Sequence, residues 1–125
     1  MQIDHVILAV NDAKESVDFY GRILGFAHEG EDGPFSVVRV DAGFTIQLAP
    51  WGTKGGEHLA FAMSRADFEL VLARIRAAGI ETGDSFHTVG KSTEVGRENG
   101  ARGAGATIYF FDPNKHLLEI RHYEE

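Results

Sequence analysis

The second half of this chain repeats the pattern of the first half at a nearly constant offset. Corresponding residues are 53, 52 and 54 positions apart in three pairs: His5 and His58, Asp12 and Ser64, Gly25 and Gly79. Such a constant offset indicates duplication of one supersecondary unit. Because a duplicated unit must fold in the same way twice, this feature limits the possible architectures more than any other in the sequence.

The first copy predicts the order β-α-β-β-β. Residues 3–10 are mostly apolar and β-branched, which is typical of a strand. Asp12 is followed three residues later by Glu15, which resembles a capping box at the start of a helix, and Gly25 is a natural helix end. Apolar residues between them recur at helical spacing. Three more strands are expected, over 26–29, 35–41 and 44–49.

The second copy restarts after a glycine-rich linker over 51–56. Ser64 and Asp67 form a second capping box, and Gly79 ends a second helix. Strands are expected over 57–63, 80–87, 106–111 and 116–123. The chain is therefore predicted to be α+β, with repeat one over about 1–50 and repeat two over 57–125.

The second copy is also longer than the first. Gln47 and Glu119 occupy matching places but are 72 positions apart, which implies an insertion, assigned here to about 88–105. This segment is rich in glycine and carries one more basic than acidic residue. It is either a lid that brings cations to an anionic substrate or a solvated loop.

Composition narrows the classes of function. The chain has 12 Lys and Arg against 19 Asp and Glu, a net charge of −7, which disfavours binding to nucleic acid or to an anionic membrane. It has no Cys, which excludes disulfides, cysteine zinc sites and thiol nucleophiles. No membrane-length apolar run or signal peptide is recognisable, so we expect a cytoplasmic protein. Six His and the many carboxylates leave metal binding open.

Strand parity places five polar residues on the same kind of face: His5, Gln47, His58, Tyr109 and Glu119. In a β-α-β-β-β unit the helix should cover the face with the bulkier apolar side chains, which leaves these residues on the open face. The next two residues on the face of His58 are alanines, so space is expected beside it. Matching histidines, with a Glu and a Gln at related positions, predict a divalent metal site.

Four segments carry a resemblance to a known family: IDHVILAVND, VDFYGRILGF, EHLAFAM and IYFFDPNKHLLEI. They resemble the vicinal oxygen chelate superfamily, also called the glyoxalase / bleomycin-resistance / dioxygenase superfamily. The resemblance covers the whole chain and implies a single domain over 1–125. It further implies a cupped mixed sheet with helices on its outer face, a divalent metal inside, and a homodimer that completes the cup.

The resemblance implies four metal ligands: His5, Gln47, His58 and Glu119. Two imidazoles and a carboxylate suit iron, manganese, nickel, cobalt or zinc, and leave positions open for a substrate. One anionic ligand leaves a net positive charge at a divalent ion, which favours a chelating, oxygen-rich substrate such as an enediolate or catecholate. Glu119 and Tyr109 are the candidate catalytic residues, and Arg121 shares their face.

Of four functions, the sequence favours the first, a metal-dependent enzyme of glyoxalase-like type, and the other three remain as alternatives. The first is a glyoxalase-like lyase or isomerase with Glu119 as base, although Gln47 cannot be a second base. The second is an extradiol dioxygenase, although the upstream histidine of its signature is absent and Lys115 stands where that signature usually has glycine or proline. The third is a fosfomycin-type transferase that opens an epoxide, although Ile7 stands where that family has a threonine. The fourth is a bleomycin-resistance-like protein that only binds small molecules.

Overall fold

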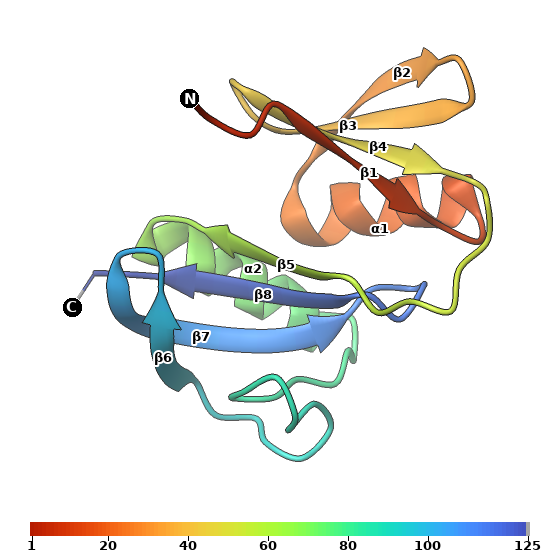
Figure 1. Cartoon of the computed structure of the whole chain (residues 1–125). Coiled ribbons are helices and arrows are strands. Elements are labelled where there is room, and N and C mark those ends of the chain that lie inside the picture. Colours follow the sequence, from red (N-terminus) through yellow and green to blue (C-terminus); the bar gives the residue numbers. More distant parts are fainter. Residues whose placement is uncertain (125) are drawn as a thin grey trace. The chain divides into compact units, whose positions relative to one another are not determined.

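The computed structural model describes Met1–Glu124 and divides the chain into two compact units (Figure 1). The first unit is Met1–Gly55 and the second begins at Gly56, so the boundary falls inside the predicted linker. Each unit contains one helix and one four-stranded mixed sheet, in the order β-α-β-β-β. The predicted α+β class and the duplication are therefore confirmed.

The two units share one topology. The elements of the first unit are β1 (His5–Ala9), α1 (Ala13–Leu24), β2 (Ala27–Asp32), β3 (Phe35–Asp41) and β4 (Phe44–Ala49). The elements of the second are β5 (His58–Ala62), α2 (Arg65–Ala77), β6 (Gly96–Gly100), β7 (Gly103–Phe111) and β8 (Leu117–His122). The strand orders are β1-β4-β3-β2 and β5-β8-β7-β6. In each sheet the first strand is parallel to the last, and the other pairs are antiparallel.

Both helices begin where the capping boxes predict. The carboxylate of Asp12 accepts a hydrogen bond from the backbone N–H of Glu15 at 3.0 Å, and the Ser64 hydroxyl accepts one from that of Asp67 at 3.1 Å. The first helix ends at Gly25, whose φ of 79° lies in the left-handed region that glycine tolerates without strain.

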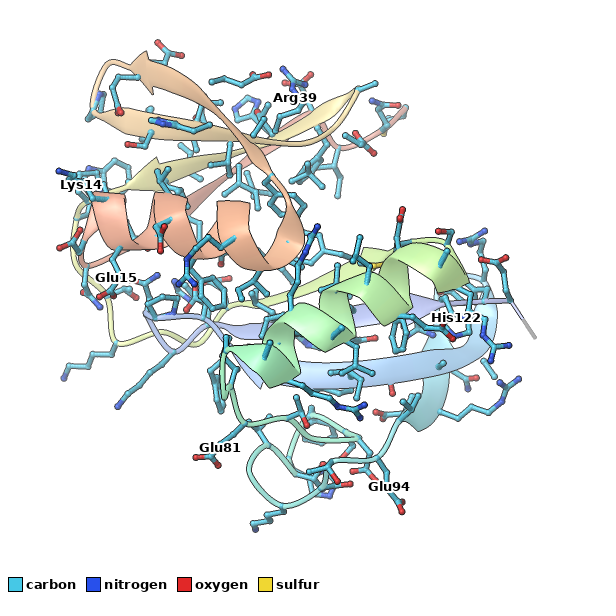
Figure 2. The ribbon with its side chains drawn as sticks, turned by 180° about the vertical axis from the view of Figure 1, so that it is seen from behind. Lys14, Glu15, Arg39, Glu81, Glu94 and His122 are labelled. Atoms are coloured by element: carbon cyan, nitrogen blue, oxygen red, sulfur yellow. The ribbon has the colours of Figure 1, made fainter. Side chains whose placement is uncertain are left out.

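The burial of the strands alternates as parity predicts. In β1 the side chain of Leu8 is buried, whereas His5 and Ile7 are exposed. In the second unit, Phe68 of α2 packs edge-on against the His122 ring at 4.8 Å, which identifies the face of β8 that the helix covers (Figure 2). The large apolar residues of each sheet therefore lie under its helix, and the candidate site residues lie on the opposite face. None of the helices of the described residues is long and apolar enough to span a membrane.

One predicted strand is wrong. Residues 80–87 are irregular chain and turns, with Gly83 alone among them in an isolated bridge to Tyr109. The second strand of the second unit is β6, inside the segment 88–105 that was assigned as an insertion. The extra residues lie before β6, in the stretch that carries Glu81 and Glu94 (Figure 2). Apolar Ile80 and Phe86 favoured the wrong segment, whereas the sequence of β6, GRENG, has no apolar side chain.

The turn between β7 and β8 contains a buried carboxylate that holds the backbone. Asp112 Oδ1 accepts hydrogen bonds from the backbone N–H groups of Asn114 at 2.8 Å and His116 at 2.9 Å. His116 is buried too, and its Nδ1 accepts a bond from the Glu57 N–H at 3.2 Å. This histidine is therefore structural, in keeping with the absence of any predicted site role.

We expect Asp112→Ala to lower the free energy of unfolding by about 3 kcal/mol, because two buried N–H groups lose their acceptor. Urea unfolding followed by circular dichroism measures the change. Asp112→Asn, which retains one acceptor oxygen, should cost clearly less. A loss below about 1 kcal/mol for the alanine variant would show that water replaces the carboxylate.

Candidate functional site

The face of the second sheet opposite α2 gathers the chemically active side chains of that unit. The strand register pairs Ala60 of β5 and Tyr109 of β7 with Glu119 on β8, so their side chains lie on one face. His58 lies two residues before Ala60 on the same face. The three predicted site residues of this unit, His58, Tyr109 and Glu119, are therefore brought together.

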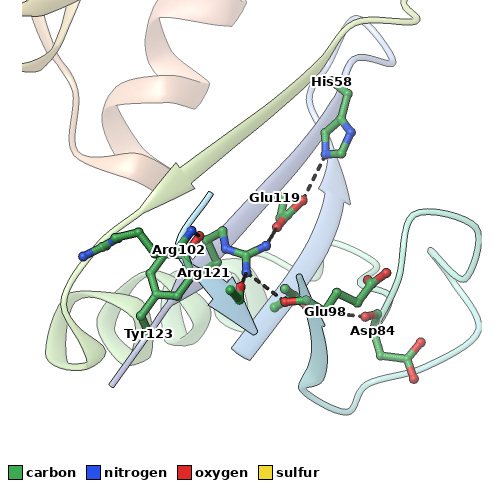
Figure 3. Close-up of polar contacts among 9 residues, drawn as sticks. His58, Asp84, Glu98, Arg102, Glu119, Arg121 and Tyr123 are labelled. Atoms are coloured by element: carbon green, nitrogen blue, oxygen red, sulfur yellow. Dashed lines mark hydrogen bonds and ion pairs between the residues drawn. The ribbon is translucent and has the colours of Figure 1, made fainter. Parts of the chain in front are cut away.

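His58 and Glu119 lie within hydrogen-bonding distance of each other (Figure 3). His58 Nε2 lies 3.1 Å from Glu119 Oε1, and the His58 and Tyr109 ring centroids are 5.7 Å apart. The His58 side chain is 45% exposed, whereas that of Glu119 is 4% exposed. Two atoms bound at right angles to one ion at about 2.1 Å would be about 3 Å apart. The separation of these two donor atoms therefore fits a shared divalent ion.

The other oxygen of Glu119 is held by a buried cation. Arg121 Nη1 donates to Glu119 Oε2 at 2.6 Å, and both side chains are at most 5% exposed. Arg121 Nη2 donates to the backbone carbonyl of Glu98 at 2.9 Å (Figure 3). The carboxylate thus lies between the Arg121 guanidinium on one side and the His58 imidazole on the other.

Tyr109 is held in its protonated form. Burial raises the pKa of the Tyr109 hydroxyl well above its ordinary value, and hydrogen bonding and charge repulsion from Glu119 and Glu98 raise it further. A phenol with a raised pKa stays neutral at physiological pH. At this position Tyr109 can donate a hydrogen bond or a proton, but it cannot act as a base.

This raised pKa predicts an alkaline loss of stability. Above about pH 10 the unfolded chain releases the Tyr109 proton while the folded chain keeps it, so stability falls as pH rises. Between pH 9 and pH 11 the protein should lose about 1 kcal/mol more than Tyr109→Phe, as measured by urea unfolding at each pH. A constant difference between the two proteins would contradict this prediction.

The first unit presents the matching face. The register pairs His5 with Thr45 and Ile7 with Gln47, the same relation that pairs His58 with Leu117 and Ala60 with Glu119. His5 and Gln47 therefore occupy equivalent places to His58 and Glu119.

The ring of His5 is oriented by a neighbouring carboxylate. His5 Nδ1 lies 2.7 Å from Asp4 Oδ2, an arrangement that leaves Nε2 as the free donor atom. In the described residues no three His, Asp or Glu side chains already form a group that could hold an ion.

Sequence reasoning missed two contributors to these faces. Glu98 was counted within the insertion, but β6 pairs it with Gly105 and places it on the same face as Tyr109. Asp4 was not assigned to the site. The position of Asp4 next to a candidate histidine is a signal that could have been used. No sequence signal marks GRENG as a strand.

Comparison with known proteins gives a family match. A family model described as "Glyoxalase/Bleomycin resistance protein/Dioxygenase superfamily" matches residues 2–120. This match spans β1 of the first unit through most of β8 of the second, so it includes every candidate site residue.

Individual relatives include a glutathione transferase, an oxidase and a fosfomycin resistance protein. The chain is 27% identical to glutathione transferase FosA of Serratia marcescens, over 94% of this chain and 78% of that protein. It is 32% identical to oxidase ChaP-H2, with a TM-score of 0.84 over 99% of this chain and 94% of that one. A mutant of fosfomycin resistance protein FosX from Listeria monocytogenes, solved with Mn(II), has the same fold (22% identity, TM-score 0.70, 96% of this chain and 88% of that one).

Proposed function

Because the chain belongs to the Glyoxalase/Bleomycin resistance protein/Dioxygenase superfamily, we propose that it is a metal-dependent enzyme acting on a small, oxygen-rich substrate. His5, His58 and Glu119 are the proposed ligands of a divalent ion, with Gln47 as a weaker fourth ligand. The observation that carries the proposal is the 3.1 Å approach of His58 Nε2 to Glu119 Oε1 on the sheet face opposite α2. The Mn(II) in the FosX structure supports a metal in a protein of this fold.

The donor set favours oxidation as the reaction. Two imidazoles and one carboxylate are typical of non-haem Fe(II) oxygenases, and a bound ion of this kind supplies redox and Lewis-acid chemistry. The 32% identity to oxidase ChaP-H2 supports the same choice. We therefore place an oxidase or dioxygenase reaction ahead of the lyase or isomerase reaction.

The contact between Arg121 and Glu119 gives a physical reason to place the oxidase ahead of the lyase or isomerase. In the glyoxalase-like reaction Glu119 would have to act as a base, which requires a carboxylate that is free to accept a proton. Here the Arg121 guanidinium donates a hydrogen bond to Glu119 Oε2 at 2.6 Å, so one of the two carboxylate oxygens is already occupied. Glu119 is thus suited to be a permanent ligand, while Tyr109 supplies a hydrogen bond or a proton to the substrate.

One observation favours the lyase or isomerase as a second candidate. Glu98 places a carboxylate beside Tyr109 on the same sheet face, and it is outside the proposed ligand set. A carboxylate that is not bound to the ion could accept a proton from a carbon next to a carbonyl group. Glu98 would then fill the role that Gln47 cannot fill.

Elemental analysis of protein purified without chelators or an affinity tag tests the proposal. About one iron per chain, together with oxygen consumption on adding catechols, would support the oxidase. Nickel, manganese, cobalt or zinc, without oxygen consumption, would support the lyase or isomerase instead. A chain that takes up none of these ions after each is added would overturn metal-dependent catalysis and leave a small-molecule binding protein.

We also propose that the protein is a homodimer, as the family resemblance implies. Light scattering after size-exclusion chromatography should give about twice the chain mass of 13.7 kDa. A mass that stays at one chain over a wide concentration range would contradict this proposal.

A further inference from the structure

We propose that Arg121 is a positioning residue that makes Glu119 a ligand through one oxygen only. The inference rests on the proposed metal site. Arg121 Nη1 contacts Oε2 of Glu119 at 2.6 Å, and Oε1 points to His58 Nε2 at 3.1 Å (Figure 3). With Oε2 occupied by the guanidinium, only Oε1 is available beside the imidazole.

The residues around the Arg121 guanidinium fix its position. A Cβ atom added at Gly100 would lie 2.5 Å from Arg121 Cζ, and one at Gly105 would lie 3.1 Å from Arg121 Nη2. The ring of Tyr123 stacks on the guanidinium, with its centroid 4.8 Å from Cζ. Two glycines and an aromatic ring thus form a fitted cradle for this side chain. A fitted cradle restricts the rotamers of Arg121 and so fixes the oxygen that it contacts.

The contact between Arg121 and Glu119 leaves one carboxylate oxygen of Glu119 free of the guanidinium. A bidentate pair would use both carboxylate oxygens, but here one nitrogen of the fork contacts one oxygen. Arg121 Nη2 is directed instead to the backbone carbonyl of Glu98 at 2.9 Å, and its buried Nε has no hydrogen-bond partner within residues 1–124. The Arg121 guanidinium is therefore oriented to contact one oxygen of Glu119, Oε2, and not both carboxylate oxygens.

The first unit provides an internal comparison. Gln47 corresponds to Glu119, and the residue two positions later, which corresponds to Arg121, is the buried Ala49. The guanidinium is thus present beside the anionic candidate ligand and absent beside the neutral one. This difference is expected if its task is to hold a carboxylate.

Loss of the guanidinium should have two opposite effects on metal affinity. A nearby cation repels a divalent ion, so its removal alone would tighten binding. Removal also frees the carboxylate to rotate away from His58, which would weaken binding. Changes in residues that orient metal ligands typically lower affinity 10–100-fold. We expect the positional effect to be the larger one, so Arg121→Met should bind Mn²⁺ about 10–100-fold more weakly.

Four variants separate these effects. Arg121→Lys retains the charge and one donor, and it should recover part of the affinity that Arg121→Met loses. Arg102→Met is the matched control, because the Arg102 guanidinium stacks on the same Tyr123 ring at 4.3 Å but lies on an exposed residue. Gly100→Ala displaces the Arg121 guanidinium without removing a polar group, and it remains informative if Arg121→Met does not fold. Glu119→Gln tests the metal site itself.

The experiment is a titration of the metal-free proteins with Mn²⁺, followed by calorimetry and by the electron paramagnetic resonance signal of free Mn²⁺. Thermal melts of the metal-free variants show which are folded. The proposal predicts that affinity follows the order unchanged protein and Arg102→Met, then Arg121→Lys, then Arg121→Met, with Gly100→Ala also weakened.

Equal or tighter Mn²⁺ binding by folded Arg121→Met would overturn the positioning role. An equal loss in Arg102→Met would overturn it as well, because that result would assign the effect to packing on Tyr123. Unchanged Mn²⁺ binding by Glu119→Gln would instead overturn the proposed metal site. Failure of the positioning role and failure of the site are therefore distinguishable.

Discussion

Glu119→Gln is expected to abolish stoichiometric binding of a divalent ion. The affinity should fall by about 100-fold or more, because even changes in residues that only orient metal ligands typically lower it about 10–100-fold. The substitution replaces the carboxylate of the proposed ligand set with a neutral amide of the same shape. It also leaves the Arg121 cation, which contacted Glu119 Oε2 at 2.6 Å, without a partner of opposite charge. The site then has no anionic ligand to attract a cation. It also keeps the buried positive charge of Arg121, which repels a cation.

Calorimetric titration with Mn²⁺ and elemental analysis after dialysis measure the loss. Glu69→Gln is the matched control, because Glu69 lies on the exposed surface of α2 and forms an exposed ion pair with Arg65 at 3.2 Å. A surface pair of this kind contributes little, so the control should bind metal as the unchanged protein does. If Glu119→Gln still bound nearly one metal ion per chain, that result would contradict the assignment of Glu119 as a ligand.

Most of the fold could be predicted from the sequence because its signals are local. The capping boxes at Asp12 and Ser64 and the glycine at 25 mark helix ends through contacts within three or four residues. The alternation in β1 identifies the covered face from neighbouring residues alone. These features occur twice, so each repeat supports the interpretation of the other.

The strand β6 could not be predicted for the opposite reason. It is an edge strand that pairs only with β7, and its sequence contains two glycines and three polar residues. Nothing in such a stretch favours a strand by itself. It becomes a strand because the hairpin at Gly100–Gly103 returns the chain onto β7.

The candidate site was predictable in its residue types but not in its contacts. Parity places His58, Tyr109 and Glu119 on one face, but the 3.1 Å approach of His58 to Glu119 joins residues 61 positions apart. That distance depends on the parallel register of β5 and β8. The contact of Arg121 with Glu119 depends on space above Gly100, which only the folded hairpin reveals.

Substitutions of Glu119 and Arg121 should have strongly non-additive effects on the free energy of unfolding, because the two side chains form a buried ion pair. Removing one member of a buried ion pair leaves an uncompensated charge and typically costs about 3–5 kcal/mol. Both side chains here are at most 5% exposed, so water cannot solvate the remaining charge. We expect Arg121→Met to lower the free energy of unfolding of the metal-free protein by about 3 kcal/mol or more.

The double variant Glu119→Gln with Arg121→Met should be more stable than the Arg121→Met single variant. It leaves no unpaired charge, and replacement of a whole buried pair by neutral groups is often close to neutral. A double-mutant cycle from urea unfolding at pH 7 should therefore give a coupling energy of about 2 kcal/mol or more. Additive losses would mean that solvent compensates each charge separately. Because Arg121 also donates to the Glu98 carbonyl, some loss should persist in the double variant even when the charges cancel.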